Sequence, residues 1–145
     1  MHLLGNMLFL WIYGDNVEDA LGHARYVAFY LICGVAAIFA QAWSAPGSPY
    51  PIIGASGAIS GVLGAYLLLF PRARVLTLVL LPFFFTTVRM PAMLLLLLWF
   101  AVQLISDLAA APDGGASVAF RAHIGGFLTG MLLVPFLKRR EVALC

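Results

Sequence analysis

The chain has 145 residues, a net charge of +2, a hydrophobic fraction of 63% and a charged fraction of only 10%. Globular domains usually carry about 25% charged residues, far more than this chain. Together with a mean hydropathy of +1.03, this low charged fraction excludes an ordinary soluble fold and indicates a lipid environment. The small net charge argues against a nucleic-acid partner. Cys33 and Cys145 suggest neither a disulfide framework nor a metal site. We expect that the protein needs no cofactor. We also expect no signal peptide at the start of the chain, because Met1 is not followed by a basic region or a cleavage site.

Six apolar runs follow one another along the chain, separated by polar or turn-forming residues. They cover residues 3–13, 24–43, 54–70, 75–88, 90–106 and 122–137. A helix needs about 20 residues to cross the hydrocarbon core, so the second run is long enough, and flanking residues extend the third, fifth and sixth. The first run is too short to span alone. Pro82 interrupts the fourth, which makes that run a poor spanning helix.

Positive charge orients the runs, because cytoplasmic loops collect Lys and Arg. If 75–88 dips into the membrane or lies on it without crossing, seven of the eight basic residues fall on one side and Arg121 on the other. If 75–88 crosses, the split is four to four. We therefore expect an all-α, polytopic transmembrane helix bundle with five spans and one re-entrant or interfacial segment. The C-terminus is then cytoplasmic, and loops 44–53 and 107–121 lie outside.

Three polar side chains fall at the outer ends of predicted spans: His2 on the first, Ser56 on the third and His123 on the last. Polar groups within a membrane are costly and usually face the bundle interior or a water-filled cavity. A serine that attacks a carbonyl needs a nearby base, and histidine titrates near neutral pH. Taken alone, however, Ser56 is typical of a helix cap and His123 of an interfacial anchor.

Helical periodicity gives Ser56 and His123 glycine-lined faces. The third run carries Ser56, Ser60 and Gly64 on one stripe, with Gly57 and Gly61 beside it, and the last carries His123, Gly126, Phe127 and Gly130. Glycines let helices approach closely in lipid, where helices associate by packing. The two faces could therefore bring the hydroxyl and the imidazole within hydrogen-bond reach.

Several motifs, in order along nearly the whole chain, resemble those of the rhomboid family of intramembrane serine proteases. They are His2-x-x-x-Asn6, the stretch from Trp11 to Leu31, Gly54-Ala55-Ser56-Gly57 and Ala122-His123-Ile124-Gly125-Gly126. The resemblance implies that Ser56 is the nucleophile and His123 its base, in a dyad without a carboxylate. It also implies that His2 and Asn6, with the Ser56 backbone N–H, stabilise the oxyanion.

The resemblance assigns roles to the remaining outer segments as well. The span 90–106 is similar to the helix proposed as a lateral gate for substrate, and 107–121 to the loop that caps the site. Pro112, Gly114 and Gly115 suit such a cap. We place Asp107 at the end of its span and Asp113 in an exposed turn, so neither is expected to complete a triad.

Two departures from the family pattern concern Ser60 and the N-terminus. Some rhomboids carry a tyrosine at the position of Ser60 that stacks on the catalytic histidine, so we expect glycine packing and a bond from Ser60 to hold His123. The family's first helix and the loop after it have no counterpart before His2. We therefore expect residues 1–140 to be an N-terminally truncated rhomboid-like protease domain and 141–145 a short cytoplasmic tail. The truncation favours a fragment or a mis-started reading frame over a helix supplied from elsewhere.

The function expected from the resemblance is cleavage of transmembrane segments by a Ser–His dyad. The partners are then the lipid bilayer and transmembrane proteins with a helix-destabilising stretch, while the activity of these 145 residues alone and the oligomeric state stay open. The alternative is a non-catalytic rhomboid-like protein that binds client helices, although such relatives generally lack the Ser or the His. A transporter is disfavoured, because Gln41 and Gln103 lie near span ends. Abundant Ala, Leu, Gly and Arg suggests a bacterial inner membrane.

Overall fold

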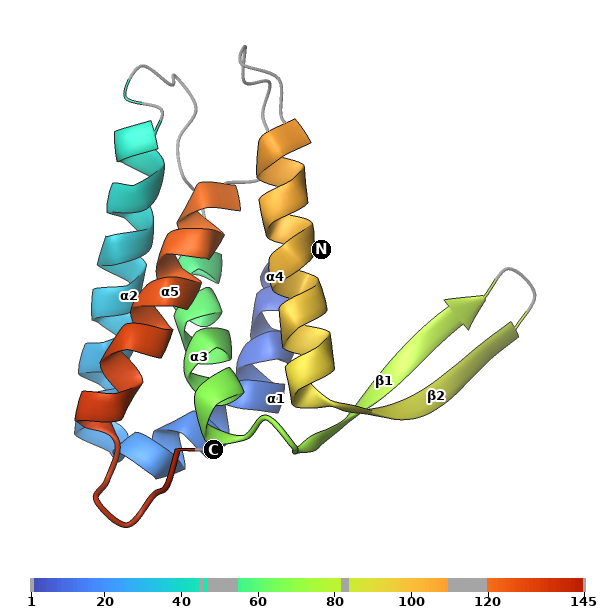
Figure 1. The fold of residues 1–145 in the computed structure, drawn as a ribbon, viewed down its shortest axis with the longest axis horizontal. Coiled ribbons are helices and arrows are strands. Elements are labelled where there is room, and N and C mark those ends of the chain that lie inside the picture. The colour runs from blue at the N-terminus through green and yellow to red at the C-terminus, as the bar shows by residue number, and fades with distance from the viewer. Residues whose placement is uncertain (1, 45, 47–54, 82–83, 110–119, 145) are drawn as a thin grey trace.

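In the part of the chain that the computed structural model describes, the protein forms a bundle of five helices from which a β-hairpin projects (Figure 1). The structure describes residues 2–44, 46, 55–81, 84–109 and 120–144. Its elements are α1 (His2–Leu21), α2 (His23–Ser44), α3 (Ser56–Leu69), β1 (Arg74–Leu81), β2 (Phe84–Pro91), α4 (Ala92–Ala109) and α5 (Phe120–Leu137). The structure confirms the predicted helical bundle. The prediction of an all-α fold is not confirmed, because the chain also forms two β-strands.

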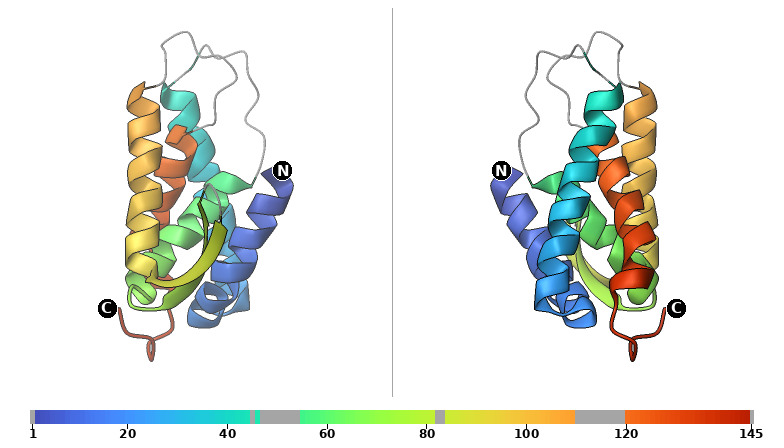
Figure 2. Two further views of the ribbon diagram at one scale, coloured as in Figure 1. Left: turned by 90° about the vertical axis from the view of Figure 1, so that its right-hand side faces the viewer. Right: turned by 90° about the vertical axis from the view of Figure 1, so that its left-hand side faces the viewer.

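Helix α3 occupies the centre of the bundle, with the other helices around it (Figure 2). Nearly all of its side chains are buried, whereas the surrounding helices turn large apolar side chains outward. Trp43 is 91% exposed and Phe136 84% exposed. Such an outer surface is stable in lipid but not in water. Burial by four neighbours also explains how a helix as short and apolar as α3 is held in place.

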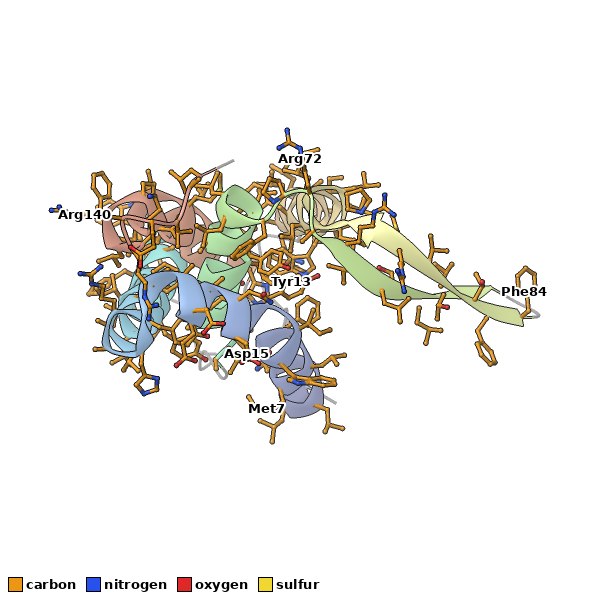
Figure 3. All side chains as sticks on the ribbon, turned by 90° about the horizontal axis from the view of Figure 1, so that it is seen from below. Met7, Tyr13, Asp15, Arg72, Phe84 and Arg140 are labelled. Carbon is orange, nitrogen blue, oxygen red and sulfur yellow. The ribbon has the colours of Figure 1, made fainter. Side chains whose placement is uncertain are left out.

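Helix α1 is longer than the apolar run 3–13 suggests, because it continues through Gly14 and Asp15 to Leu21. The view from below shows it passing from Met7 through Tyr13 and Asp15 across the end of the bundle (Figure 3). Tyr13 and Val17 are buried against the core, and this packing outweighs the helix penalty of glycine, about 1 kcal/mol. The helix therefore extends beyond the predicted apolar run at its inner end, while at its outer end Leu3 is 70% exposed.

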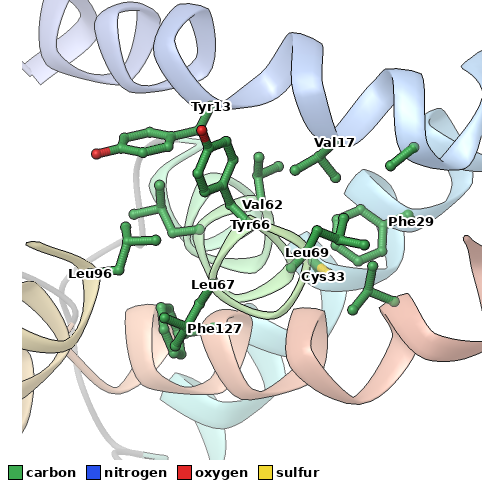
Figure 4. Packing of buried hydrophobic residues seen from close by; sticks show 14 of the residues in the cluster. Tyr13, Val17, Phe29, Cys33, Val62, Tyr66, Leu67, Leu69, Leu96 and Phe127 are labelled. Atoms are coloured by element: carbon green, nitrogen blue, oxygen red, sulfur yellow. The ribbon is translucent and has the colours of Figure 1, made fainter. Parts of the chain in front are cut away.

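The turn between α1 and α2 depends on Gly22, which has φ of +87°. Its backbone N–H donates to Glu18 O, so Gly22 ends α1 in the left-handed conformation that other residues rarely adopt. Gly22 O then accepts from Tyr26 N–H and begins α2. The core that this turn helps to close joins residues of α1, α2, α3, α4 and α5 (Figure 4).

The run 75–88 forms an antiparallel hairpin rather than a helix. Its strands pair from Arg74 opposite Pro91 to Leu81 opposite Phe84. Valine, threonine and phenylalanine favour this extended pairing over a helix. Figure 3 shows the hairpin leaving the bundle, with Phe84 at its far end. The re-entrant or interfacial placement of this segment stays a prediction.

Among the helices that the structure describes, three are long and apolar enough to cross a membrane: α2, α4 and α5. Helix α3 is apolar but shorter, with 14 residues. Within the described ranges the protein is therefore mostly helical with three candidate spans by length and composition, and five spans are not confirmed. Arg25 and Arg139 lie at the end opposite Ser56, since Arg25 donates to Leu137 O and the Arg139 backbone N–H to Ala20 O.

The glycine faces of α3 and α5 meet as the sequence predicts. A methyl group on Gly126 would overlap the carbonyl oxygen of Gly57, and one on Gly130 would overlap that of Gly61. The two helix backbones are therefore in direct contact over more than one turn. This close approach is what sets the distance between the first turns of α3 and α5.

Replacing Gly130 by alanine is expected to lower the free energy of unfolding by about 2 kcal/mol or more, because the backbone of α3 cannot yield locally. The measurement is denaturant unfolding in detergent micelles, followed by circular dichroism. Gly5→Ala is the matched control, since its new methyl group would meet nothing within 4 Å. Equal stability of the Gly130→Ala and Gly5→Ala proteins would contradict this packing.

Candidate active site

Ser56 is the first residue of α3 and is partly buried. The first intrahelical bond of α3 runs from Ile59 N–H to Ala55 O, so the backbone N–H groups of Ser56, Gly57 and Ala58 have no acceptor within the helix. Such N–H groups at a helix N-terminus favour negative charge. The hydroxyl of Ser56 therefore lies where an anion that forms beside it would be stabilised.

His123 lies in the first turn of α5 and is only 8% exposed. Its Nε2 atom is 2.9 Å from the Oγ atom of Ser56, although the two residues are 67 positions apart in the chain. This distance is within the range of a hydrogen bond. If Nε2 carries the lone pair, the imidazole can take the hydroxyl proton as the oxygen attacks a carbonyl.

Gln103 of α4 contacts the other side of the same ring. Its Oε1 atom is 2.8 Å from His123 Nδ1, and the side chain is 8% exposed. The sequence reasoning missed this residue, which it used only to argue against a transporter. The available signal was a glutamine in an otherwise apolar span, since such groups usually face the bundle interior.

Aromatic side chains also lie beside His123. The ring of Trp99 lies beside the imidazole, with centroids 5.8 Å apart and planes inclined by 41°. Phe127 in turn stacks on Phe100 at 4.5 Å. The predicted bond from Ser60 is wrong, because the Ser60 hydroxyl donates to Ser56 O at 2.7 Å. Besides Ser56, the described contacts of the ring thus include a glutamine and a tryptophan of α4.

The predicted oxyanion residues lie on α1, which packs against α3. His2 begins that helix, and the structure does not describe its side chain. Asn6 is partly buried, and no hydrogen bond among the described residues joins it to Ser56 or His123. The roles of His2 and Asn6 stay predictions.

The N-terminus of α5 is tied to α2 and α4 by polar contacts. Arg121 donates to Asp107 Oδ1 at 2.8 Å and to Ser44 O at 3.0 Å, and Gln41 Oε1 accepts from Ala122 N–H at 3.3 Å. Asp107 is therefore paired with Arg121 and does not approach His123 as a triad carboxylate would.

The predicted capping loop and the sequence around Gly54 fall largely outside the described residues. This applies to Pro112, Asp113, Gly114 and Gly115. Within the described ranges, no group of three or more His, Cys, Asp or Glu residues is placed to hold a metal ion. The polar side chains that the structure brings together at this site are Ser56, His123 and Gln103.

Comparison with known proteins gives a consistent family match. A model described as the Rhomboid domain matches residues 1–140. "Rhomboid protein 1, mitochondrial" of Saccharomyces cerevisiae is 31% identical over 142 residues, which is 95% of this chain and 38% of that protein. The human "Presenilin-associated rhomboid-like protein, mitochondrial" is also 31% identical, over 93% of this chain and 34% of that protein.

A bacterial relative matches a shorter stretch. "Rhomboid protease GluP" of Bacillus subtilis is 47% identical over 66 residues, or 46% of this chain and 12% of that protein. No solved structure gives a significant match. The chain thus spans between a third and two fifths of the length of the yeast and human relatives.

The prediction of a bacterial inner membrane is wrong. The yeast and human relatives, which align with more than nine tenths of the chain, are named as mitochondrial proteins. A high content of Ala, Leu, Gly and Arg is compatible with a helical bundle in any membrane, so it does not identify which membrane holds the protein. The assignment of the C-terminus to the cytoplasm, which was argued from the distribution of Lys and Arg, belongs to the same prediction of location and is withdrawn with it.

Proposed function

The chain belongs to the rhomboid family, and from this premise we propose that it is an intramembrane serine endopeptidase that cleaves transmembrane segments of membrane proteins. The observation that carries the proposal is the 2.9 Å approach of Ser56 Oγ to His123 Nε2. A hydroxyl and a mostly buried imidazole from distant parts of the chain meet at the end of an apolar bundle. Packing alone does not require that pair, whereas nucleophilic catalysis does.

In the proposed reaction, Ser56 attacks the scissile carbonyl while His123 takes its proton. The acyl-enzyme forms as His123 returns the proton to the leaving amine, and water then hydrolyses the ester by the same route in reverse. The backbone N–H of Ser56, which has no acceptor within α3, is with His2 and Asn6 the proposed donor set for the oxyanion. No cofactor takes part in this scheme.

The proposed substrate is a transmembrane helix with a destabilised stretch. A peptide bond in a regular helix is shielded by its own hydrogen bonds, so the segment must open locally before Ser56 can reach the carbonyl. Helix α4 borders the site through Trp99 and Gln103 and has an apolar outer face. We propose that substrate enters beside α4, in a protease domain of residues 1–140 that spans the bilayer five times, followed by a short tail at 141–145.

The test is cleavage of a reporter transmembrane segment by the purified protein in proteoliposomes. A reporter with a Gly–Pro stretch near its end should be cut, and the same reporter with leucines there should be cut more slowly. Loss of cleavage in the Ser56→Ala protein assigns the activity to this site. If Ser56→Ala cuts as fast as the parent, the protease proposal fails. Client binding without cleavage by the parent would favour a non-catalytic rhomboid-like protein.

A further inference from the structure

We propose that Gln103 is the positioning residue of the Ser56–His123 pair: its side-chain oxygen holds the His123 ring in the tautomer whose Nε2 lone pair faces the Ser56 hydroxyl. The effect on catalysis rests on the proposed function. The tautomer itself does not, because it can be measured in a protein that cleaves nothing.

The hydrogen-bond chemistry of the three groups determines where the proton lies. An amide oxygen only accepts, so the contact of Gln103 Oε1 with His123 Nδ1 at 2.8 Å requires the hydrogen on Nδ1. A neutral imidazole carries one N–H, which leaves the lone pair on Nε2. That atom is the one 2.9 Å from Ser56 Oγ. Gln103 thereby leaves His123 ready to accept the serine proton.

The surroundings strengthen this assignment. Gln103 and His123 are both buried, and a buried polar group without its partner is costly, so the amide and the ring stay together. The charged side chains at this end of α4 and α5, Asp107 and Arg121, are paired with each other. Trp99 covers part of the ring without offering an acceptor to Nδ1. Among the described contacts, the group that accepts from Nδ1 is the neutral amide.

The three groups come from three different helices, which links the position of α4 to the catalytic pair. Ser56 is on α3, His123 on α5 and Gln103 on α4. The backbones of α3 and α5 are locked by their glycines, whereas α4 meets α5 mainly through side chains such as Phe100 on Phe127. Movement of α4 away from α5 would remove the acceptor from Nδ1 and release the ring.

The first test measures the tautomer by ¹⁵N NMR of histidine-labelled protein in nanodiscs, at a pH where imidazole is neutral. The signals of His2, His23 and His123 are assigned by substitution. We expect Nδ1-protonated His123 in the parent and a shift toward the Nε2-protonated form in Gln103→Leu. An Nε2-protonated ring in the parent, or an unchanged ring in Gln103→Leu, overturns the proposal.

The second test measures cleavage against pH. Gln103→Leu should lower kcat by about 10- to 100-fold with little change in KM, because the ring loses its orientation. Gln103→Glu restores an acceptor and adds a negative charge that favours the protonated ring, so the acid limb of its pH profile should move to higher pH. In Gln103→Leu, which loses the acceptor, the limb should move to lower pH. A purely structural role would not shift the two variants in opposite directions.

Gln41→Leu is the matched control. It removes another glutamine that contacts α5, but from the Ala122 backbone rather than from the ring, so its rate should stay within about threefold and its pH profile unchanged. If Gln103→Leu does not fold, Gln103→Glu decides: a pH profile superimposed on that of the parent overturns the proposal. If the proposed function is wrong, the two measurements separate. The Ser56→Ala protein then still cleaves the reporter, while NMR still finds His123 protonated on Nδ1.

Discussion

The Ser56→Ala protein is expected to cleave a transmembrane reporter at least about 10⁴-fold more slowly than the parent, because removal of a serine nucleophile leaves only binding and electrostatic stabilisation. The change deletes one oxygen from the first turn of α3, where the neighbouring N–H groups and His123 remain in place. The fold is therefore expected to survive. The measurement is the single-turnover rate in proteoliposomes, with unfolding in detergent as the check on stability.

Ser60→Ala is the matched control for Ser56→Ala. Ser60 lies one turn further along the same helix, is buried and bonds the backbone carbonyl of Ser56. Removal of its hydroxyl should change the rate by no more than about threefold, as expected for a residue with only a local backbone bond. A fluorophosphonate probe should label the Ser60→Ala protein and not the Ser56→Ala protein. Comparable losses in both would mean that α3 tolerates no change at its N-terminus.

The sequence predicted the meeting of Ser56 and His123 better than most other features. Each residue stands beside glycines at helical spacing, and in lipid such faces pack against each other because no side chain holds the backbones apart. The structure confirms that packing between Gly126 and Gly57 and between Gly130 and Gly61. The roles of Ser56 and His123 were harder to predict from the sequence, because either residue alone is compatible with a purely structural role.

Features that depend on contacts between distant parts of the chain could not be predicted from the sequence. The pattern around Gly14 and Asp15 indicates a break, yet burial of Tyr13 and Val17 carries α1 through it. In the run 75–88, periodicity alone does not separate a short apolar helix from paired strands. Gln103 was visible as a polar residue in an apolar span, but its partner is 20 positions away on another helix. Only the packing of α4 on α5 reveals that contact.

The His123→Ala protein is expected to lose cleavage by about 10⁴-fold, similar to the loss in Ser56→Ala, because residues that act as a unit are not additive. The serine remains, but among the side chains that the structure describes no other base contacts its hydroxyl. Combining the two substitutions should therefore cost little more than either alone. Independent, multiplying losses in the double variant would show that Ser56 and His123 do not act on the same step.

His23→Ala is the matched control for His123→Ala. His23 is strongly exposed at the start of α2 and pairs with Glu18, at the end of the bundle away from Ser56. Its loss should leave the rate within about threefold of the parent. Fluorophosphonate labelling separates activation from binding: the probe should react with Ser56 in the His23→Ala protein and fail to react in His123→Ala. Equal labelling of both would mean that the imidazole 2.9 Å from Ser56 does not activate it.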